Sequence, residues 1–342
     1  MSLGKKKIQH QAAAAAGITA TDHFTPKAYA GGSAGQSVTV GFQPDLIIGK
    51  RRDSAENWWA NDATRTGSLF PNLDLAEISF QYTTPTSTGF TVNGTGGVHN
   101  TGNLITYCFK GGGDSNTYNI DGTGYSTRSA AGLTSGTIAD AKFLGCSTNT
   151  AAGFSVIKYN GSGASAGQTI DTGLTSDIEL MIIKNVSTGN WVVVDSHTNK
   201  YHFLNTTATG VGITFTDYVD GTKPKLYDFS TFIHYCFHSV PGYSDIGTYL
   251  GTGATGNAIT TGFEPRFLMI KSSSNAEPWF ILDAVRDASN PRDNRLMVDS
   301  NAAEDDGSVH TVNFDSNGFT ANGTIGNGTN GSGVTYLYLA IA

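Results

Sequence analysis

Three aspartates recur in the sequence, each four residues after a tryptophan. They are Asp62, Asp195 and Asp283. An arginine follows the first and third aspartates three residues later, the second copy carries Thr198 instead, and Glu77 and Glu304 add further carboxylates. Carboxylates catalyse proton transfer when one asymmetric site tunes their pKa values. Three near-equivalent copies indicate an architectural role, so we expect no catalytic residue and no cofactor.

A second candidate for chemistry is a set of metal-ligand residues on one expected strand. His234, Cys236 and His238 alternate, so their side chains share a face that could bind zinc. The corresponding side chains in the other copies are Thr106, Cys108 and Lys110, and then Leu337, Leu339 and Ile341. Such variation is typical of packing positions and no fourth ligand is apparent, so no metal site is predicted. The acidic stretch 303–307 lacks the spacing of a calcium loop and is expected to be a solvated turn.

The recurring aspartates belong to a hairpin that the sequence contains three times. In each copy an apolar run ends at a lysine, a polar turn follows, and a tryptophan opens the returning strand. The lysine and the tryptophan are 8, 7 and 8 residues apart in the three copies. This agreement indicates one supersecondary unit used three times. The recurring positions are Lys50, Trp58, Asp62, Arg65, Lys184, Trp191, Asp195, Lys271, Trp279, Asp283 and Arg286.

On a strand, the four-residue spacing puts the tryptophan and the aspartate on one face. Either the aspartate is buried and held by hydrogen bonds, including one from the arginine three residues on, or this face meets solvent. Repeated positions usually serve the packing of the repeat itself, which favours burial. The doubled Trp58 and Trp59 point to opposite faces, and we take this pair as the candidate for stacking on a glycan.

Composition narrows the class of protein. The 342 residues include 43 glycines but only 14% charged residues, a combination typical of all-β proteins with many turns. The net charge of −7 argues against nucleic-acid binding, and no apolar run of about 18 residues is present for membrane insertion. The three cysteines are an odd number, which favours assembly in a reducing cytoplasm over a disulfide framework.

The repeats divide the chain into an arm, three units and an insertion. We expect three tandem antiparallel β-sandwich-like units, at residues 23–110, 151–240 and 241–342, with a Gly-rich surface insertion at 111–150. Residues 1–22 are expected to form a docking arm, because lysines and an alanine tract give little material for a core. The candidate docking residues are Lys5, Lys6, Lys7 and Ile8.

The combined motifs resemble a repeat of bacteriophage virion proteins, particularly those of marine T7-like podoviruses. The shared pattern is Gly-Phe-x-Pro with an apolar run to Ile-Lys, then Trp-x-x-x-Asp-x-x-Arg, Asn-x-x-x-Ala-Glu, Ser-x-Gly-Phe-Thr and Tyr-Cys-Phe. The string from Tyr235 to Ser244 is the most characteristic part. The resemblance covers residues 23–342 apart from the insertion, and it implies a structural or tail-associated role without an active site. The second copy departs from it at Thr198, which leaves the completeness of its sheet open.

These observations predict a non-enzymatic virion protein, a tail-fibre, tail-appendage or host-attachment component assembled in the host cytoplasm. Its expected partners are other virion proteins through the arm, a host surface glycan or receptor, and further copies of itself. Capsid decoration is the alternative from another class. Depolymerisation of host polysaccharide is a third possibility and would require a pair of carboxylates in a groove.

Overall fold

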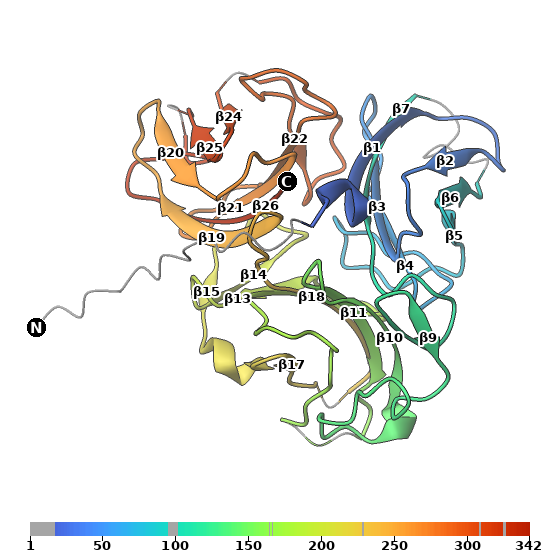
Figure 1. The fold of residues 1–342 in the computed structure, drawn as a ribbon. Coiled ribbons are helices and arrows are strands. Elements are labelled where there is room, and N and C mark those ends of the chain that lie inside the picture. Colours follow the sequence, from blue (N-terminus) through green and yellow to red (C-terminus); the bar gives the residue numbers. More distant parts are fainter. Residues whose placement is uncertain are drawn as a thin grey trace, which may run out of the picture.

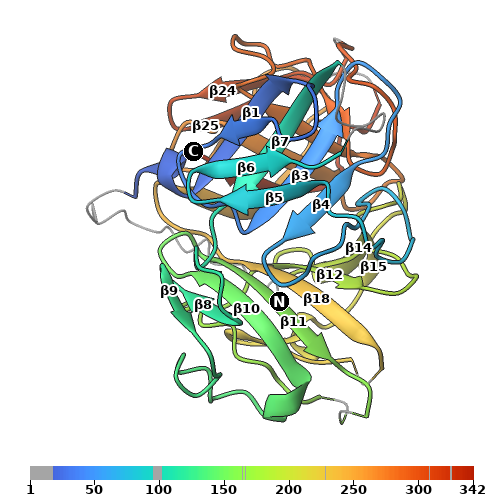
Figure 2. The same cartoon turned by 90° about the vertical axis from the view of Figure 1, so that its right-hand side faces the viewer.

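The computed structural model describes residues 18–342 except 95–101, 164, 166, 228, 308, 324 and 325. The chain is all-β and is built from several antiparallel sheets, as predicted, although the largest sheet also contains a parallel pair of strands. Figure 1 shows three lobes around a common centre, and Figure 2 shows the same molecule from the side. The helices in the described ranges are single 3-10 turns. They are η1 (Ala20–Asp22), η2 (Asp140–Lys142) and η3 (Phe215–Asp217).

The first unit, residues 18–110, is a sandwich of two sheets. Its principal sheet has the strand order β1-β7-β3-β4 and its outer sheet the order β2-β6-β5. The strands are β1 (Phe24–Ala30), β2 (Ser37–Thr39), β3 (Leu46–Arg51), β4 (Trp59–Asp62), β5 (Thr83–Thr86), β6 (Gly89–Val92) and β7 (Asn103–Phe109).

The third unit, residues 241–342, repeats this arrangement. Its principal sheet has the order β19-β26-β21-β22-β23 and its outer sheet the order β20-β25-β24. The strands are β19 (Ser244–Leu250), β20 (Asn257–Thr260), β21 (Phe267–Ser272), β22 (Trp279–Asp283), β23 (Leu296–Met297), β24 (Val312–Asp315), β25 (Gly318–Ala321) and β26 (Thr335–Ile341).

The second unit, residues 111–240, has a nine-stranded principal sheet of order β15-β14-β13-β12-β18-β11-β10-β8-β9 and a two-stranded sheet β16-β17. Its strands are β8 (Tyr118–Ile120), β9 (Thr123–Tyr125), β10 (Phe143–Asn149), β11 (Phe154–Asn160), β12 (Leu180–Asn185), β13 (Val192–Asp195), β14 (Lys200–Phe203), β15 (Val211–Gly212), β16 (Val219–Asp220), β17 (Lys223–Pro224) and β18 (Thr231–Phe237).

The expectation that residues 111–150 form a surface excursion is wrong. Strand β10 pairs with β11 along its length, and β8 pairs with β10, so this segment extends the sheet of the second unit. The boundary predicted at residue 150 therefore cuts a hairpin. The pattern was missed because β10 reads Phe-Leu-Gly-Cys-Ser-Thr-Asn, in which polar side chains lie at buried positions.

Four strands of each principal sheet share one order and one register. In β3, β12 and β21, the first residue of the strand pairs with the recurring aspartate on one side and with Phe109, Phe237 or Ile341 on the other. This correspondence supports the three-copy interpretation. It also shows that the sheet around Thr198 is complete in the described residues.

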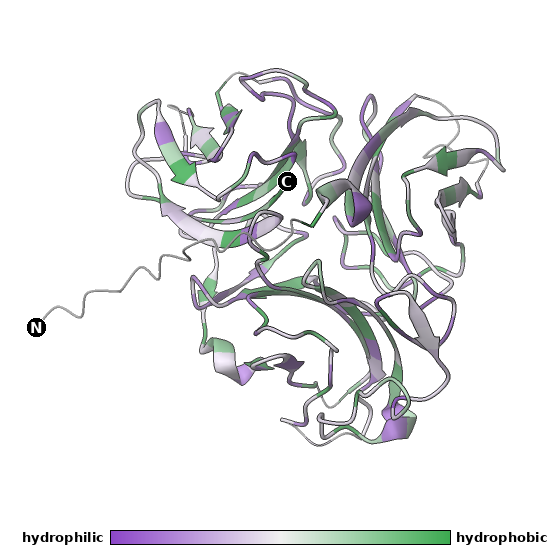
Figure 3. Ribbon diagram, viewed as in Figure 1, coloured by the Kyte–Doolittle hydropathy of each residue, from purple (hydrophilic) through white to green (hydrophobic). Residues whose placement is uncertain are grey.

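Both faces of each principal sheet are buried. One face packs into a central core that contains residues of all three units, and the other packs into a separate core within its own unit. The lysine-terminated strands are accordingly apolar without alternation, as expected for strands covered on both sides. Figure 3 shows apolar residues concentrated along these strands.

The folded body begins before residue 23, where the predicted arm ends. Ile18 and Ala20 pack against the central core, and the His23 ring meets Tyr243 edge to face. Residues 18–22 therefore belong to the body rather than to an arm. Within the described ranges, no helix combines the length and the apolar character needed to cross a membrane.

Candidate functional site

The recurring aspartates are buried, and two of them form ion pairs with the arginine three residues on. The distance from Asp62 Oδ2 to Arg65 Nε is 2.5 Å, and the same atoms of Asp283 and Arg286 are also 2.5 Å apart. Each of these four side chains is at most 1% exposed. Of the two arrangements that the sequence left open, the structure shows the buried one.

Each of these carboxylates also accepts a hydrogen bond from a tyrosine of the neighbouring unit. Tyr235 of the second unit donates to Asp62 of the first at 2.8 Å, and Tyr107 of the first donates to Asp283 of the third at 2.8 Å. Burial, together with the adjacent carboxylate, raises the pKa of both tyrosines well above the usual value. Both hydroxyls therefore stay protonated as donors that join two units.

A glutamate completes each cluster. Glu77 Oε1 lies 3.1 Å from Arg65 Nη1, and Glu304 Oε2 lies 2.8 Å from Arg286 Nη1. Glu304 also pairs with Arg52 of the first unit at 2.7 Å. Burial alone would raise the pKa of Glu304, but the bonds from Arg52 and the charge of Arg286 hold it below the usual value. The expectation of a solvated turn at 303–307 is therefore wrong for Glu304, which joins the first and third units.

Among the described residues, the seam between the second and third units lacks this cluster. Asp195 accepts bonds from the hydroxyl and the backbone N–H of Thr198, both at 2.6 Å, and burial raises its pKa. The position equivalent to Tyr107 and Tyr235 in β26 is Leu339, because all three pair with the third residue of the central strand. The replacement of arginine by Thr198 and of tyrosine by Leu339 thus occurs at one seam.

The recurring tryptophans join the units in a ring. Each indole N–H donates to a backbone carbonyl of the neighbouring unit, so the first unit bonds to the third, the third to the second and the second to the first. The bonds run from Trp58 to Met297, from Trp191 to Phe70 and from Trp279 to Phe203, at 2.9, 3.0 and 2.9 Å. Head-to-tail contacts that close on themselves give a bounded assembly, here within one chain.

The recurring lysines hold the hairpin turns from inside. Their ammonium groups donate to backbone carbonyls, and all three side chains are buried. The bonds run from Lys50 to Arg51 and Ser54, from Lys184 to Ser187 and Gly189, and from Lys271 to Glu277. Lys271 also donates to Thr207 of the second unit. Burial lowers the pKa of each lysine to about 8.

The residues considered for zinc are packing residues. His234 is buried with its Nε2 3.2 Å from the Tyr159 hydroxyl, and burial lowers its pKa to about 3. The described residues contain no group of three or more His, Cys, Asp or Glu side chains placed to hold a metal ion. The register also places Ala340, rather than Leu339, at the position of Cys108 and Cys236.

The predicted glycan contact at Trp58 and Trp59 is wrong. Both rings are 0% exposed: Trp58 belongs to the central core, and Trp59 belongs to the core between the two sheets of the first unit. The two rings do point to opposite faces, but each face is covered. The predicted docking residues Lys5, Lys6, Lys7 and Ile8 lie outside the described residues.

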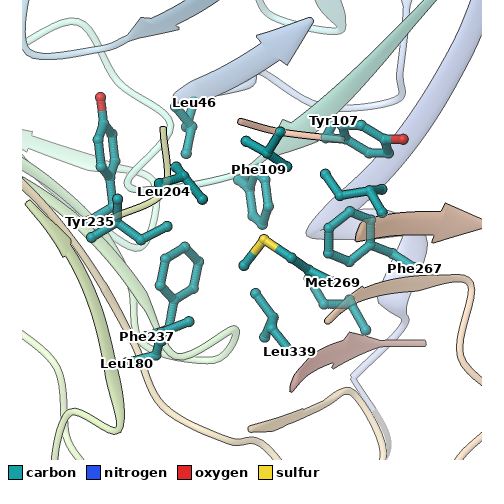
Figure 4. Packing of buried hydrophobic residues seen from close by; sticks show 14 of the residues in the cluster. Leu46, Tyr107, Phe109, Leu180, Leu204, Tyr235, Phe237, Phe267, Met269 and Leu339 are labelled. Carbon is teal, nitrogen blue, oxygen red and sulfur yellow. The ribbon is translucent and has the colours of Figure 1, made fainter. Parts of the chain in front are cut away.

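The centre of the molecule is a cavity of about 50 Å³ with an apolar lining from all three units. Figure 4 shows Phe109, Phe237 and Met269 packed near one another there, with the hydroxyls of Tyr107 and Tyr235 pointing outward.

We did not predict from the sequence that Tyr107 and Tyr235 join neighbouring units. One signal in the sequence could have revealed these roles. The second copy has Thr198 in place of the arginine, and the third copy has Leu339 in place of the tyrosine.

Chemically, the three recurring aspartates can hold units together but are not exposed to a substrate in solution. Asp62, Asp195 and Asp283 are each fully buried and already bonded. Tyrosine hydrogen bonds to these aspartates cross two of the three seams between units. Tryptophan hydrogen bonds cross all three seams. The recurring residues therefore contribute to a framework that joins the units.

Comparison with known proteins gives a family without an assigned activity. No curated protein matches the chain. No solved structure matches it either. The model of one family, described as a domain of unknown function (DUF7483), matches residues 19–342, which is nearly the whole of the body described above. The chain belongs to this DUF7483 family.

Proposed function

We propose that the chain is a non-enzymatic structural protein of a bacteriophage virion, located at the tail and used in host attachment. The observation that carries the proposal is the burial of all the recurring charged residues at the seams or beneath the hairpin turns. The outer surface is left to loops rich in uncharged polar residues, which suit contact with glycans and other proteins. The resemblance to virion repeats supports the same role.

Capsid decoration is the alternative, and one feature favours it. Three units of like topology surround a common centre, so the chain could sit over a three-fold position of an icosahedral shell (Figure 1). A particle reconstruction or immunogold labelling separates the two roles. Density at the tail supports the proposal, whereas density spread over the shell contradicts it in favour of decoration.

The depolymerase alternative has its own test. We expect the purified protein to release no reducing sugar from host envelope, because Asp62 and Asp283 are buried in structural clusters. Release that is lost in correctly folded Asp62→Ala or Asp283→Ala protein would overturn the non-enzymatic proposal.

Docking by the N-terminal segment is tested by deletion. Because Ile18 and Ala20 pack on the body, the deletion should end at residue 17. We expect the shortened protein to keep the thermal unfolding of the full chain and to be missing from purified particles. Normal incorporation of the shortened protein would contradict the docking role.

A further inference from the structure

A polar pocket of about 320 Å³ opens at the seam between the first and second units. It is open to solvent and its lining is mostly polar, unlike the enclosed, mainly apolar pockets that bind drug-sized ligands. The first unit supplies all of its lining residues except Lys158, which belongs to β11 of the second unit. The polar lining includes Arg65, Thr66, Gly67, Glu77, Ser79 and Lys158.

The wall from the first unit is held in place. Arg65 is fixed by Asp62 and donates to Glu77 Oε1 at 3.1 Å, which orients that carboxylate. Gly67 permits this arrangement, because a Cβ there would lie 2.4 Å from both Glu77 Oε1 and the Ile78 carbonyl oxygen. Glu77 remains 24% exposed, so one acceptor group is accessible.

The lining residue from the second unit is Lys158, whose ammonium group can donate further hydrogen bonds. Lys158 is half-buried in β11, its Nζ donates to the Thr64 carbonyl at 3.4 Å, and within the described ranges it forms no ion pair. The equivalent positions of the other units are Ala28 in β1 and Thr248 in β19. An ammonium at this position is thus a feature of this seam alone.

The pocket offers donors and acceptors with balanced charge. Lys158 and Ser79 can donate, Glu77 can accept, and the two cations Lys158 and Arg65 balance the carboxylates of Asp62 and Glu77. Neighbouring hydroxyls of a sugar match such a set, since each hydroxyl both donates and accepts. The residue after Ser79 is Phe80, whose ring is 44% exposed and packs edge to face on Tyr82.

We propose that this pocket binds a neutral, hydroxyl-rich sugar unit. The assignment of that sugar to a host glycan rests on the proposed attachment function, whereas the binding itself does not. A neutral unit is favoured over an acidic one because the carboxylates of Asp62 and Glu77 offset the charges of Arg65 and Lys158, which leaves the pocket no net positive charge to attract an anion.

The test uses the full chain with methyl glucoside, methyl galactoside and methyl mannoside as probes and methyl glucuronide as the acidic comparison. Saturation-transfer NMR and calorimetry measure binding. We expect at least one neutral probe to bind and Lys158→Ala to weaken its binding about tenfold or more, the size of one lost hydrogen bond to a charged group. Gly67→Ala should also weaken it, by displacing Glu77.

The matched control is Lys142→Ala, because Lys142 is also half-buried in the second unit and donates to one backbone carbonyl, that of Ser162. It should bind the probe like the unaltered chain. If Lys158→Ala fails to fold, Ser79→Ala at the exposed rim tests the same pocket. Absence of binding by all neutral probes, binding unaffected by these changes, or preference for the glucuronide would overturn the proposal.

These outcomes are separate from those for the proposed function. A protein found on the capsid shell that still binds a neutral sugar would leave the pocket assignment standing and remove the tail role. A protein found at the tail that binds none of the probes would leave the tail role standing and contradict the pocket assignment.

Discussion

At the scale of single residues, the unusual feature is a carboxylate shared between two units. Asp62 accepts bonds from Arg65 of its own unit and from Tyr235 of the next. A buried ion pair does not by itself indicate stability, because desolvation opposes the attraction. Removing one partner is costly, however, so a shared carboxylate makes the position of one unit depend on the other.

We therefore expect Tyr235→Phe to lower the free energy of unfolding by about 1.5–3 kcal/mol, the value of a hydrogen bond to a charged group. Chemical denaturation measures the change. Tyr125→Phe, a half-buried tyrosine at the edge of the second unit, serves as the control and should change stability little. Equal stability of the Tyr235→Phe protein and the unaltered chain would mean that this bond does not hold the seam.

Two buried histidines should make the folding stability of the protein sensitive to acid. Burial lowers the pKa of His234 and of His202 to about 3, below the value of about 6.5 in an unfolded chain. Between these values the unfolded state binds the extra protons, so stability falls as the pH falls below about 6.5. Each histidine should remove about 2 kcal/mol by pH 5.

The variant His234→Phe should reduce the slope of unfolding free energy against pH by about one proton between pH 6.5 and 4. Denaturation at several pH values measures the slope. His197→Gln, which changes an exposed histidine, is the matched control. A slope unchanged by His234→Phe would show that His234 is not neutral in the fold.

At the scale of elements, each unit contains one recurring hairpin whose turn is bonded to a buried lysine. Lys184 donates to two carbonyls of the turn that follows its own strand, at 3.1 and 2.7 Å. The two bonds give the buried ammonium group acceptors and tie the turn to the strand. The ammonium is desolvated in return, which is why its pKa is lowered to about 8.

This lowered pKa predicts a dependence on alkaline pH. Between about pH 8 and 10.5 the unfolded lysine is protonated while the folded one is not, so each lysine makes stability rise with pH in that window. The buried cysteines oppose the rise above about pH 9, because burial raises their pKa values.

The comparison of Lys184→Met with the unaltered chain isolates the lysine. From pH 8 to 9 the unaltered chain should gain about 1 kcal/mol more than the variant, because only the unaltered chain carries this titrating group. Lys225→Met, which removes a half-buried lysine at the edge of the second unit, is the matched control. Identical pH profiles for Lys184→Met and the unaltered chain would contradict the buried charge.

At the scale of the whole molecule, three units close a ring around one shared core. Each unit gives one face of its principal sheet to that core, so a separated unit would expose an apolar surface. Exposed surfaces of this kind promote association. The units are therefore parts of one cooperative body rather than independent domains on a string.

Cutting the chain tests this property. Fragments 1–241 and 242–342 end at the exposed Pro241–Gly242 turn, which leaves the sheets intact. We expect each fragment alone to aggregate or to unfold at low temperature, and the two expressed together to elute as one complex of equal stoichiometry in size-exclusion chromatography. Two stable monomers that do not associate would contradict the shared core.

Much of the local secondary structure could be predicted from the sequence. The spacing of Lys50, Trp58 and Asp62, found again in the other copies, predicted the hairpin and its side-chain faces, because alternation along a strand is a local property. The all-β class followed from the same pattern. Residues 111–150 were misread since β8 and β10 carry buried polar side chains, which local periodicity does not distinguish from a loop.

The sequence by itself determined which residues recur and on which side of a strand they lie, because those properties depend on neighbours along the chain. Only the tertiary structure decided that Trp58 is covered, that Tyr107 bonds to Asp283, and that Lys158 and Glu77 line one pocket. The reason is physical: these contacts join residues of different units, and their geometry is set by how three sheets pack around one core.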